Sequence, residues 1–199
     1  MPRKISEAGE RLKGQRLRVL DLGCANGHIG RTLRSDGYKW RFFGIDFNEA
    51  MVTECRRSEI YESALTADLN NEVPVLENGY FDVVICAGVS EFVESGPRLV
   101  NEIARVLCQS GIAILTFEMT TPDSLPRGVV QPNGIVKFHY TEPEVRELMA
   151  MAGLKVDAYE QVDAYFSPTL CKWIPYHFIV ARPTWPTSLR PVKAMGGVK

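Results

Sequence analysis

One short stretch near the start of the chain, residues 18–30, constrains the fold most strongly. A short apolar run at residues 17–22 leads into it, which is typical of a buried strand in a parallel sheet. Small residues then alternate at Gly23, Ala25 and Gly27, and a helical pattern of apolar residues follows. Small residues let a ligand approach the backbone, and the first turn of a helix offers free N–H groups. This order predicts the start of a βαβ nucleotide-binding unit.

Asp21 narrows the kind of nucleotide, because it lies just before the first glycine of this turn. A pyrophosphate beside a carboxylate would bring two anions together, which is unfavourable. A ligand that carries a positive charge, such as an amino group, suits an acid at this position. An NAD-dependent oxidoreductase therefore fits the turn poorly and stays a remote alternative.

Two further acids follow predicted strands. Asp46 closes a strand predicted over residues 40–46, and it follows Gly23 at close to the roughly 20 residues after which an acid binds ribose hydroxyls. Phe47 comes next and is placed to lie against an adenine ring, and Asn48 is the predicted N-cap of a helix. Asp68 follows a weaker strand, predicted over residues 60–66.

The phrase Val-Leu-Asp-Leu-Gly-Cys-Ala-Asn-Gly at residues 19–27 resembles motif I of the class I S-adenosylmethionine (SAM)-dependent methyltransferases. Phe-Asp-Val-Val, which starts a strand predicted over residues 80–88, is similar to the same family. Within it, the order of motifs resembles the Williams–Beuren-region methyltransferase-like subgroup. The family usually has glycine where this chain has Ala25.

The resemblance covers residues 17–181 and implies a Rossmann-like α/β fold. The expected sheet is seven-stranded and mostly parallel, with an antiparallel last strand and helices on both faces. The strands predicted over residues 154–164 and 176–181 pair antiparallel, joined by a connection at 165–175. An N-terminal arm at 1–16 and a C-terminal tail at 182–199, partly disordered, flank the methyltransferase domain.

The resemblance also implies SAM as the cofactor and S-adenosylhomocysteine (SAH) as its product. Asp68 then accepts a hydrogen bond from the adenine amino group, and backbone carbonyls at residues 86–88 meet the methionine amino group. The predicted cofactor-binding residues are Asp21, Gly23, Cys24, Ala25, Gly27, Asp46, Phe47, Met51, Asp68, Leu69, Cys86 and Ala87.

A segment rich in Pro and Gly, residues 119–140, follows a strand predicted over residues 112–117, after a turn at 109–111. In the family this segment is a substrate cover, and its length predicts a binding element that is mobile until the acceptor binds. Residues 131–134 predict a hairpin turn within it. Thr141 and Glu144 form the predicted capping box of the next helix.

The predicted catalytic residues are His139 and Glu118. His139 is preferred as the general base because an imidazole titrates near the working pH. Phe138 and Tyr140 are expected to form apolar walls beside it. The predicted acceptor-binding residues are His28, Ser90, Glu91, Phe138 and Tyr140.

The composition argues against several classes of protein. The 199 residues carry a formal net charge of −1, so the chain lacks the basic surplus typical of nucleic-acid binding. No apolar run approaches the roughly 20 residues of a membrane span, and the first residues lack a secretory core. The five cysteines show no paired metal-ligand spacing and indicate free thiols in a reducing compartment. We expect a cytoplasmic domain without a metal, nucleic-acid or membrane partner.

The expected function is methyl transfer from SAM to oxygen or nitrogen of a small-molecule acceptor. Two alternatives stay open at this point. One is a SAM-binding protein that transfers no methyl group, either a partner subunit or a catalyst of a SAM-assisted rearrangement. The other is a protein methyltransferase. Neither the acceptor nor the oligomeric state follows from the sequence.

Overall fold

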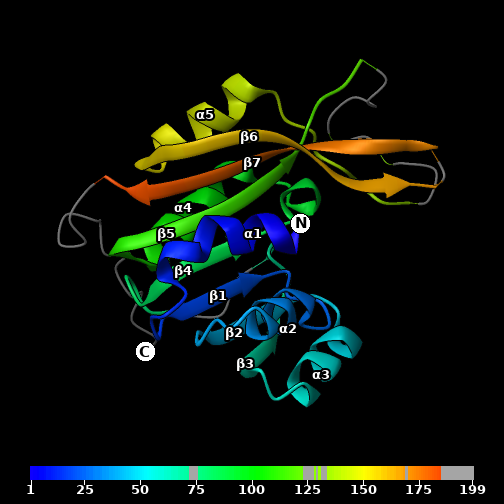
Figure 1. The fold of residues 1–199 in the computed structure, drawn as a ribbon. Helices are drawn as coiled ribbons and strands as arrows, with labels where there is room; N and C mark the ends of the chain where they lie inside the picture. The colour runs from blue at the N-terminus through cyan, green and yellow to red at the C-terminus, as the bar shows by residue number, and fades with distance from the viewer. Residues whose placement is uncertain (72–75, 123–127, 129, 131–133, 169, 185–199) are drawn as a thin grey trace, which may run out of the picture.

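The fold was analysed in a computed structural model, which describes residues 1–71, 76–122, 128, 130, 134–168 and 170–184. Seven strands form one sheet in the order β3-β2-β1-β4-β5-β7-β6 (Figure 1). This is the expected Rossmann-like architecture. In the described part of the chain, no helix has the length and apolar character needed to cross a membrane.

The first half of the chain alternates strands and helices. β1 pairs in parallel with β2 on one side and with β4 on the other. β3 extends the sheet beyond β2, again in parallel. The elements of this half are β1 (Arg18–Leu22), α2 (His28–Ser35), β2 (Arg41–Asp46), α3 (Glu49–Arg57), β3 (Tyr61–Thr66) and β4 (Phe81–Cys86).

The second half adds three strands and two helices. β7 runs antiparallel to both β5 and β6, as the two consecutive last strands predicted. The predicted capping box of α5 is present: Thr141 and Glu144 bond each other's backbone N–H groups. The elements are η2 (Ser90–Phe92), α4 (Gly96–Val106), β5 (Leu107–Glu118), α5 (Glu142–Met151), β6 (Leu154–Ser167) and β7 (Lys172–Pro183).

Two predicted connections were wrong, because the strands are longer than expected. β5 begins directly after α4, and the predicted turn at 109–111 lies within this strand at a register shift opposite β4. Residues 165–167 and 172–175 continue the β6–β7 hairpin, where Phe166 pairs with Trp173. Their rings pack edge to face at 5.8 Å, and aromatic residues favour such cross-strand pairs.

Helices cover both faces of the sheet, and each face has its own core cluster. The N-terminal arm is helical: α1 (Pro2–Gly9) and η1 (Glu10–Leu12) join α2 and α3 on one face (Figure 1). Ile5 anchors α1 in this core with no exposed surface. α4 and α5 cover the other face, where Leu99 and Val145 enter the second cluster.

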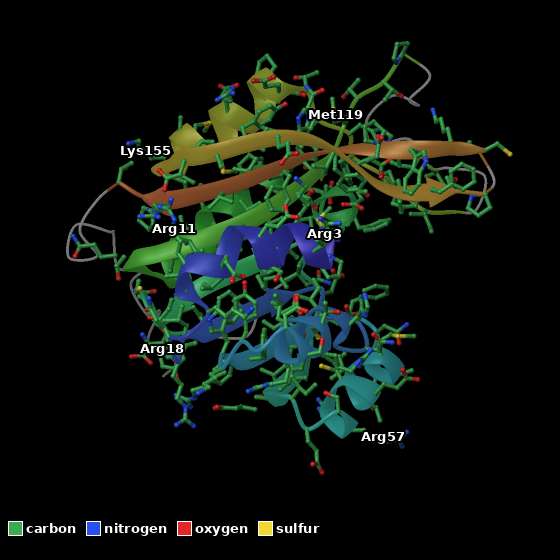
Figure 2. All side chains as sticks on the ribbon, in the orientation of Figure 1. Arg3, Arg11, Arg18, Arg57, Met119 and Lys155 are labelled. Carbon is green, nitrogen blue, oxygen red and sulfur yellow. The ribbon has the colours of Figure 1, made fainter. Side chains whose placement is uncertain are left out.

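The carboxyl ends of β1, β2, β4 and β5 meet at one edge of the sheet, since these strands are parallel. Figure 2 marks this edge with Met119, which follows β5. The chain leaves β1 for β2 on one side, and β4 lies on the other side. Ligands of open α/β sheets bind at such a reversal of strand order. Of the C-terminal tail, residues 182–183 continue β7, and residues 185–199 lie outside the described part.

Candidate cofactor and acceptor site

The turn after β1 has alternating positive backbone angles, with φ of 75° at Gly23, 44° at Ala25 and 81° at Gly27. A Cβ at Gly23 would lie 2.1 Å from Cγ2 of Val89, so a side chain here would displace the segment after β4. Ala25 is exposed and holds a left-handed conformation that costs an L-residue about 1–2 kcal/mol. The turn therefore curls tightly and leaves its backbone open for a close approach.

Asp21 is fully buried beneath this turn. The Tyr61 hydroxyl donates to its Oδ2 at 2.5 Å and accepts the N–H of Gly30 at 3.1 Å. Burial raises the pKa of Asp21 to about 7, although the Tyr61 bond acts in the opposite direction. Its Oδ1 is buried and has no hydrogen-bond partner among the described residues. The amino group of a bound ligand would satisfy this oxygen.

Asp46 ties the end of β2 to the same turn. Its Oδ2 accepts the N–H of Ala25 and its Oδ1 accepts the N–H of Asn48, both at 2.9 Å. A carboxylate oxygen accepts more than one hydrogen bond, so both oxygens keep capacity for ribose hydroxyls. Phe47 follows with 75% of its surface exposed, which leaves its ring free to stack. Asn48 caps α3 as expected and accepts the N–H of Met51 at 3.3 Å.

The loop after β3 is shaped by Asp68, which is exposed. Its carboxylate accepts the N–H of Asn70 at 2.9 Å and the side-chain amide of Asn71 at 2.8 Å. Asn70 in turn donates to the carbonyl of Phe92 at 3.0 Å, which joins this loop to η2. Leu69 is buried beside it. Both predicted adenine contacts thus stand next to the segment after β4.

At the end of β4, the chain offers backbone rather than side chains. Cys86 is buried in the core cluster beneath α4, so its side chain faces away from a ligand on the backbone. The N–H of Gly88 donates to Oγ1 of Thr116 at 2.8 Å, and the Ser90 hydroxyl donates to the Thr116 carbonyl at 2.7 Å. The Ser90 side chain is buried and committed to this bond, which gives no support to its predicted contact with an acceptor.

The other predicted residues near the turn differ in exposure. His28 is exposed at the first position of α2, and Ala87 packs half-buried against the cluster on the α1 face. The Cys24 side chain is buried against Gly44, where a Cβ would lie 2.6 Å from its Sγ. All five cysteines are free, as expected.

The two predicted catalytic residues are in contact. Nε2 of His139 lies 3.2 Å from Oε1 of Glu118, and both side chains are 8% exposed. Nζ of Lys137 lies 2.6 Å from Oε2 of Glu118. Burial acts to raise the pKa of Glu118, but the bonds from His139 and Lys137 outweigh it and the net pKa is lowered. The carboxylate is therefore ionised at neutral pH.

Backbone hydrogen bonds attach the end of the segment at residues 119–140 to the sheet. The N–H of Phe138 donates to the Glu91 carbonyl at 2.8 Å, and the N–H of Tyr140 donates to the Glu118 carbonyl at 2.9 Å. Val130 and Val136 form an antiparallel bridge, as the predicted hairpin requires. Residues 131–133 of its turn lie outside the described part.

Phe138 and Tyr140 pack against the core cluster beneath α4 and α5, which gives no support to the prediction that they form apolar walls beside the imidazole. In extended chain, successive side chains point to opposite sides. His139 faces Glu118, so its two neighbours face the core cluster beneath α4 and α5. Tyr140 is fully buried there against Phe117, with ring centroids 5.0 Å apart.

Sequence reasoning missed three residues of this region. Lys137 and Tyr176 both contact Glu118, and the Tyr176 hydroxyl lies 3.1 Å from Oε2. Tyr176 reaches the site because the β5–β7 register sets it opposite Glu118, which no local pattern reveals. His177 is structural: its ring nitrogens bond the Tyr140 carbonyl at 2.9 Å and the Tyr159 hydroxyl at 2.8 Å. Burial lowers the pKa of His177.

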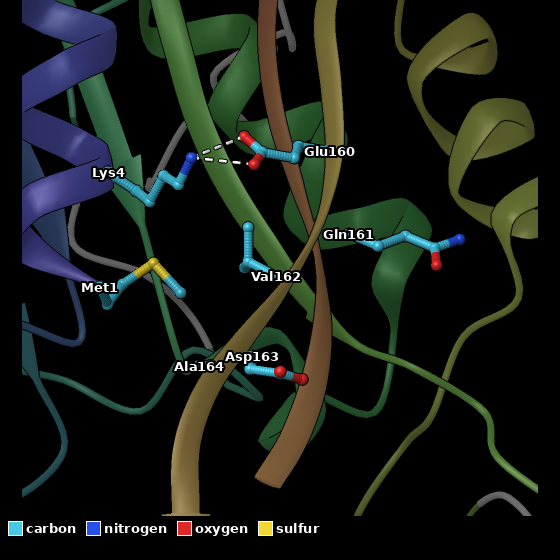
Figure 3. Close-up of a pocket in the computed structure, with 7 residues that line it drawn as sticks. All are labelled: Met1, Lys4, Glu160, Gln161, Val162, Asp163 and Ala164. Carbon is cyan, nitrogen blue, oxygen red and sulfur yellow. Dashed lines mark hydrogen bonds and ion pairs between the residues drawn. The ribbon is translucent and has the colours of Figure 1, made fainter.

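A pocket of about 290 Å³ lies between α1 and the second half of β6 (Figure 3). Lys4 and Glu160 form an ion pair at 2.8 Å on one wall, and Val162 contributes apolar surface. Val162 lies opposite Tyr176 on β7, which lies opposite Glu118 on β5. Opposed residues share a face of the sheet, so Val162 of the pocket and Glu118 lie on the same face, two strand spacings or about 10 Å apart.

Comparison with known proteins points to one family. Residues 20–115 match a family model described as a methyltransferase domain. The ubiquinone biosynthesis O-methyltransferase of Rickettsia typhi is 28% identical over 119 residues, which are 58% of this chain and 46% of the relative. The domain match, the relatives and the fold support a class I SAM-dependent methyltransferase. It spans about half or less of the length of the curated relatives it matches, and the Williams–Beuren-region subgroup is not confirmed.

Solved structures share the fold of this chain. Magnesium protoporphyrin IX methyltransferase from Synechocystis PCC 6803 with bound SAH superposes with a TM-score of 0.67 at 19% identity, over 92% of this chain and 83% of that one. The [4+2]-cyclase SpnF superposes with a TM-score of 0.71 at 18% identity, over 92% and 81%. SAM is the cofactor of this family. Oδ1 of Asp21, which has no hydrogen-bond partner among the described residues, fits the amino group of SAM. The turn at Gly23, which has no room for a side chain, fits a close approach of SAM to the backbone.

Proposed function

We propose that this methyltransferase transfers the SAM methyl group to oxygen or nitrogen of a small-molecule acceptor, with His139 as the general base. The observation that carries the proposal is the contact between Nε2 of His139 and Oε1 of Glu118 at 3.2 Å. An ionised carboxylate beside an imidazole fixes its orientation and stabilises its protonated form. The two residues come from separate segments, and in our proposal they act together as a general base and the carboxylate that orients it.

The proton inventory follows from this contact. Because Glu118 is ionised, Nε2 of His139 carries the hydrogen and donates it, which leaves a lone pair on Nδ1. Nδ1 is buried without a partner among the described residues. In our proposal it takes the proton of the acceptor as the new bond to the methyl carbon forms. When bound, SAM supplies the methyl group, and its sulfur keeps the electron pair of the broken bond.

The cofactor contacts are part of the same proposal. Asp21 pairs with the amino group of SAM, Asp46 binds the ribose hydroxyls, and Asp68 accepts from the adenine amino group. Their support is the placement of all three acids at ends of successive strands along one edge of the sheet. Gly23 and Gly88, which follow β1 and β4 and both have positive φ, would place their backbone against the bound SAM.

A small molecule fits the surroundings better than a polymer. The 290 Å³ pocket beside β6 is close to the lower end of typical small-molecule sites, and it shares a face with Glu118. One similar protein is named for ubiquinone biosynthesis and another for magnesium protoporphyrin IX, and both names refer to small molecules. The free cysteines support a reducing, cytoplasmic location.

A function without methyl transfer is the second candidate. Its support is the likeness in fold to SpnF, which is described as a [4+2]-cyclase. In that case SAM would bind and would not be consumed. A protein acceptor is a further alternative.

The test is transfer of an isotope-labelled methyl group from SAM to a metabolite extract. We expect label in the small-molecule fraction with the parent protein, and none above background with the Glu118→Gln variant. As a control, calorimetry should find that the Glu118→Gln variant still binds SAM, which requires that it is folded. Label in the protein fraction alone would move the function to a protein methyltransferase. Intact SAM after full binding would favour the non-methylating reading.

A further inference from the structure

One phenol joins two buried carboxyl groups next to the proposed base. The Tyr176 hydroxyl forms a short hydrogen bond with Oε1 of Glu91 and lies 3.1 Å from Oε2 of Glu118. Both glutamates are buried, with 2% of the whole Glu91 residue and 6% of the whole Glu118 residue exposed. The three groups come from η2, β7 and β5, so only the folded chain brings them together.

Two contacts between three oxygens require two protons. Tyr176 supplies one, because burial and the neighbouring carboxyls raise its pKa and keep the phenol protonated. Glu118 is held ionised by Lys137 and His139, as described above. The second proton therefore belongs to Glu91. Without it, the single phenol hydrogen would face two buried carboxylates and satisfy only one of them.

We propose that Glu91 is a neutral carboxylic acid in the working protein, and that Tyr176 is a positioning residue that holds the Glu118 carboxylate toward His139. In this arrangement Glu91 donates to Tyr176, and Tyr176 donates to Glu118. The catalytic meaning of this arrangement rests on the proposed function. The protonation itself does not, since it follows from contacts within the chain.

The charge of the surroundings supports the assignment. With Glu91 neutral, the negative charge of Glu118 is balanced by Lys137, and the buried cluster is neutral. Burial also raises the pKa of Glu91, although the Tyr176 bond acts against this. The titratable groups that face the cluster come from every element around it, namely Cys86, Glu91, Glu118, Lys137, His139, Tyr165 and Tyr176.

The same placement of protons indicates which hydrogen-bonding groups a bound acceptor would need. Oε2 of Glu91 and Nδ1 of His139 are both buried without a partner among the described residues. With the protons placed as above, both atoms only accept hydrogen bonds. They lie on either side of the Glu118 carboxylate, whose two oxygens bond His139 and Tyr176 separately. A small molecule bound to both atoms would present two donors: one hydroxyl or amino group to be methylated, and a second to bond Glu91.

Infrared spectroscopy of the free protein tests the protonation state directly. Glutamate labelled with heavy carbon at its side-chain carboxyl shifts the band of a neutral glutamic acid and leaves aspartic acid unchanged. We expect such a band near neutral pH in the parent. It should persist in the Asp21→Asn control, which removes the other buried carboxyl with a raised pKa, and vanish in Glu91→Gln. A parent protein without this band would overturn the proposal, whatever the protein methylates.

Methyl transfer tests the positioning role of Tyr176. Tyr176→Phe should lower turnover about 10- to 100-fold, the range for a hydrogen bond to a charged group, with SAM affinity unchanged. A fully active Tyr176→Phe variant would contradict the positioning role of Tyr176.

Discussion

Asp21 is the residue whose charge responds most directly to pH in the proposed cofactor site. Its pKa of about 7 means that a pairing with the amino group of SAM must remove a proton from the free protein below neutrality. SAM affinity should therefore fall as pH decreases below 7, by up to tenfold per unit. It should be highest between the pKa of Asp21 and that of an α-amino group, about 7.7–8.0.

Calorimetry in buffers of different ionisation enthalpy measures both the affinity and the proton released. The Asp21→Asn variant should bind more weakly near neutral pH and lose the acid limb. If the parent binds SAM equally well on both sides of pH 7 and releases no proton, Asp21 does not pair with the amino group.

Ala25 is strained by its positive φ of 44°. Ala25→Gly should relieve about 1–2 kcal/mol of backbone strain in the folded state. It should also cost about 0.4–1 kcal/mol of stability, because glycine gives the unfolded chain more conformational entropy. We therefore expect a net stabilisation of about 0.5–1 kcal/mol in urea unfolding. The same exchange inside a helix, Ala104→Gly in α4, should instead destabilise by about 1 kcal/mol or more. A loss of stability in Ala25→Gly would argue against a left-handed conformation in this turn.

At the scale of elements, the end of the segment at residues 119–140 is the piece that joins base and sheet. Backbone bonds hold Phe138 to Glu91 and Tyr140 to Glu118, and the contacts of Lys137 and His139 with Glu118 add to them. Hydrogen exchange at the amides of Phe138 and Tyr140 should be slow even in the free protein, because both N–H groups are bonded and lie close to buried residues. Fast exchange at both amides without ligand would show that this end detaches from the sheet.

Sequence patterns predicted most elements because they are local. The motif at residues 18–30, the caps Asn48 and Thr141 and the antiparallel last strands all follow from periodicity and turn chemistry, and all are present. The errors lie where pairing partners decide: the aromatic ends of β6 and β7 extend as strand because Phe166 packs on Trp173. The direction of Tyr140 likewise depends on which neighbour faces Glu118.

At the scale of the whole molecule, the sheet order decides which side chains can work together. Lys137 and His139 come near Glu118 at the end of the segment 119–140, and no local sequence pattern predicts the path of that segment. Tyr176 lies beside Glu118 because of the antiparallel β5–β7 register. The acids at the ends of β1 and β2 were predictable because each lies in the last residues of its own strand. The acceptor side is assembled from long-range contacts, which explains why Tyr176 and Lys137 were missed.

The most direct test of the account is methyl-transfer turnover in the His139→Ala variant, with its SAM affinity measured in parallel. If His139 is the base held by Glu118, turnover should fall by about 10²–10⁴, the usual contribution of a positioned base, while SAM affinity is unchanged. Turnover in His139→Ala within a few-fold of the parent would contradict the account and leave alignment of acceptor and methyl group as the source of catalysis.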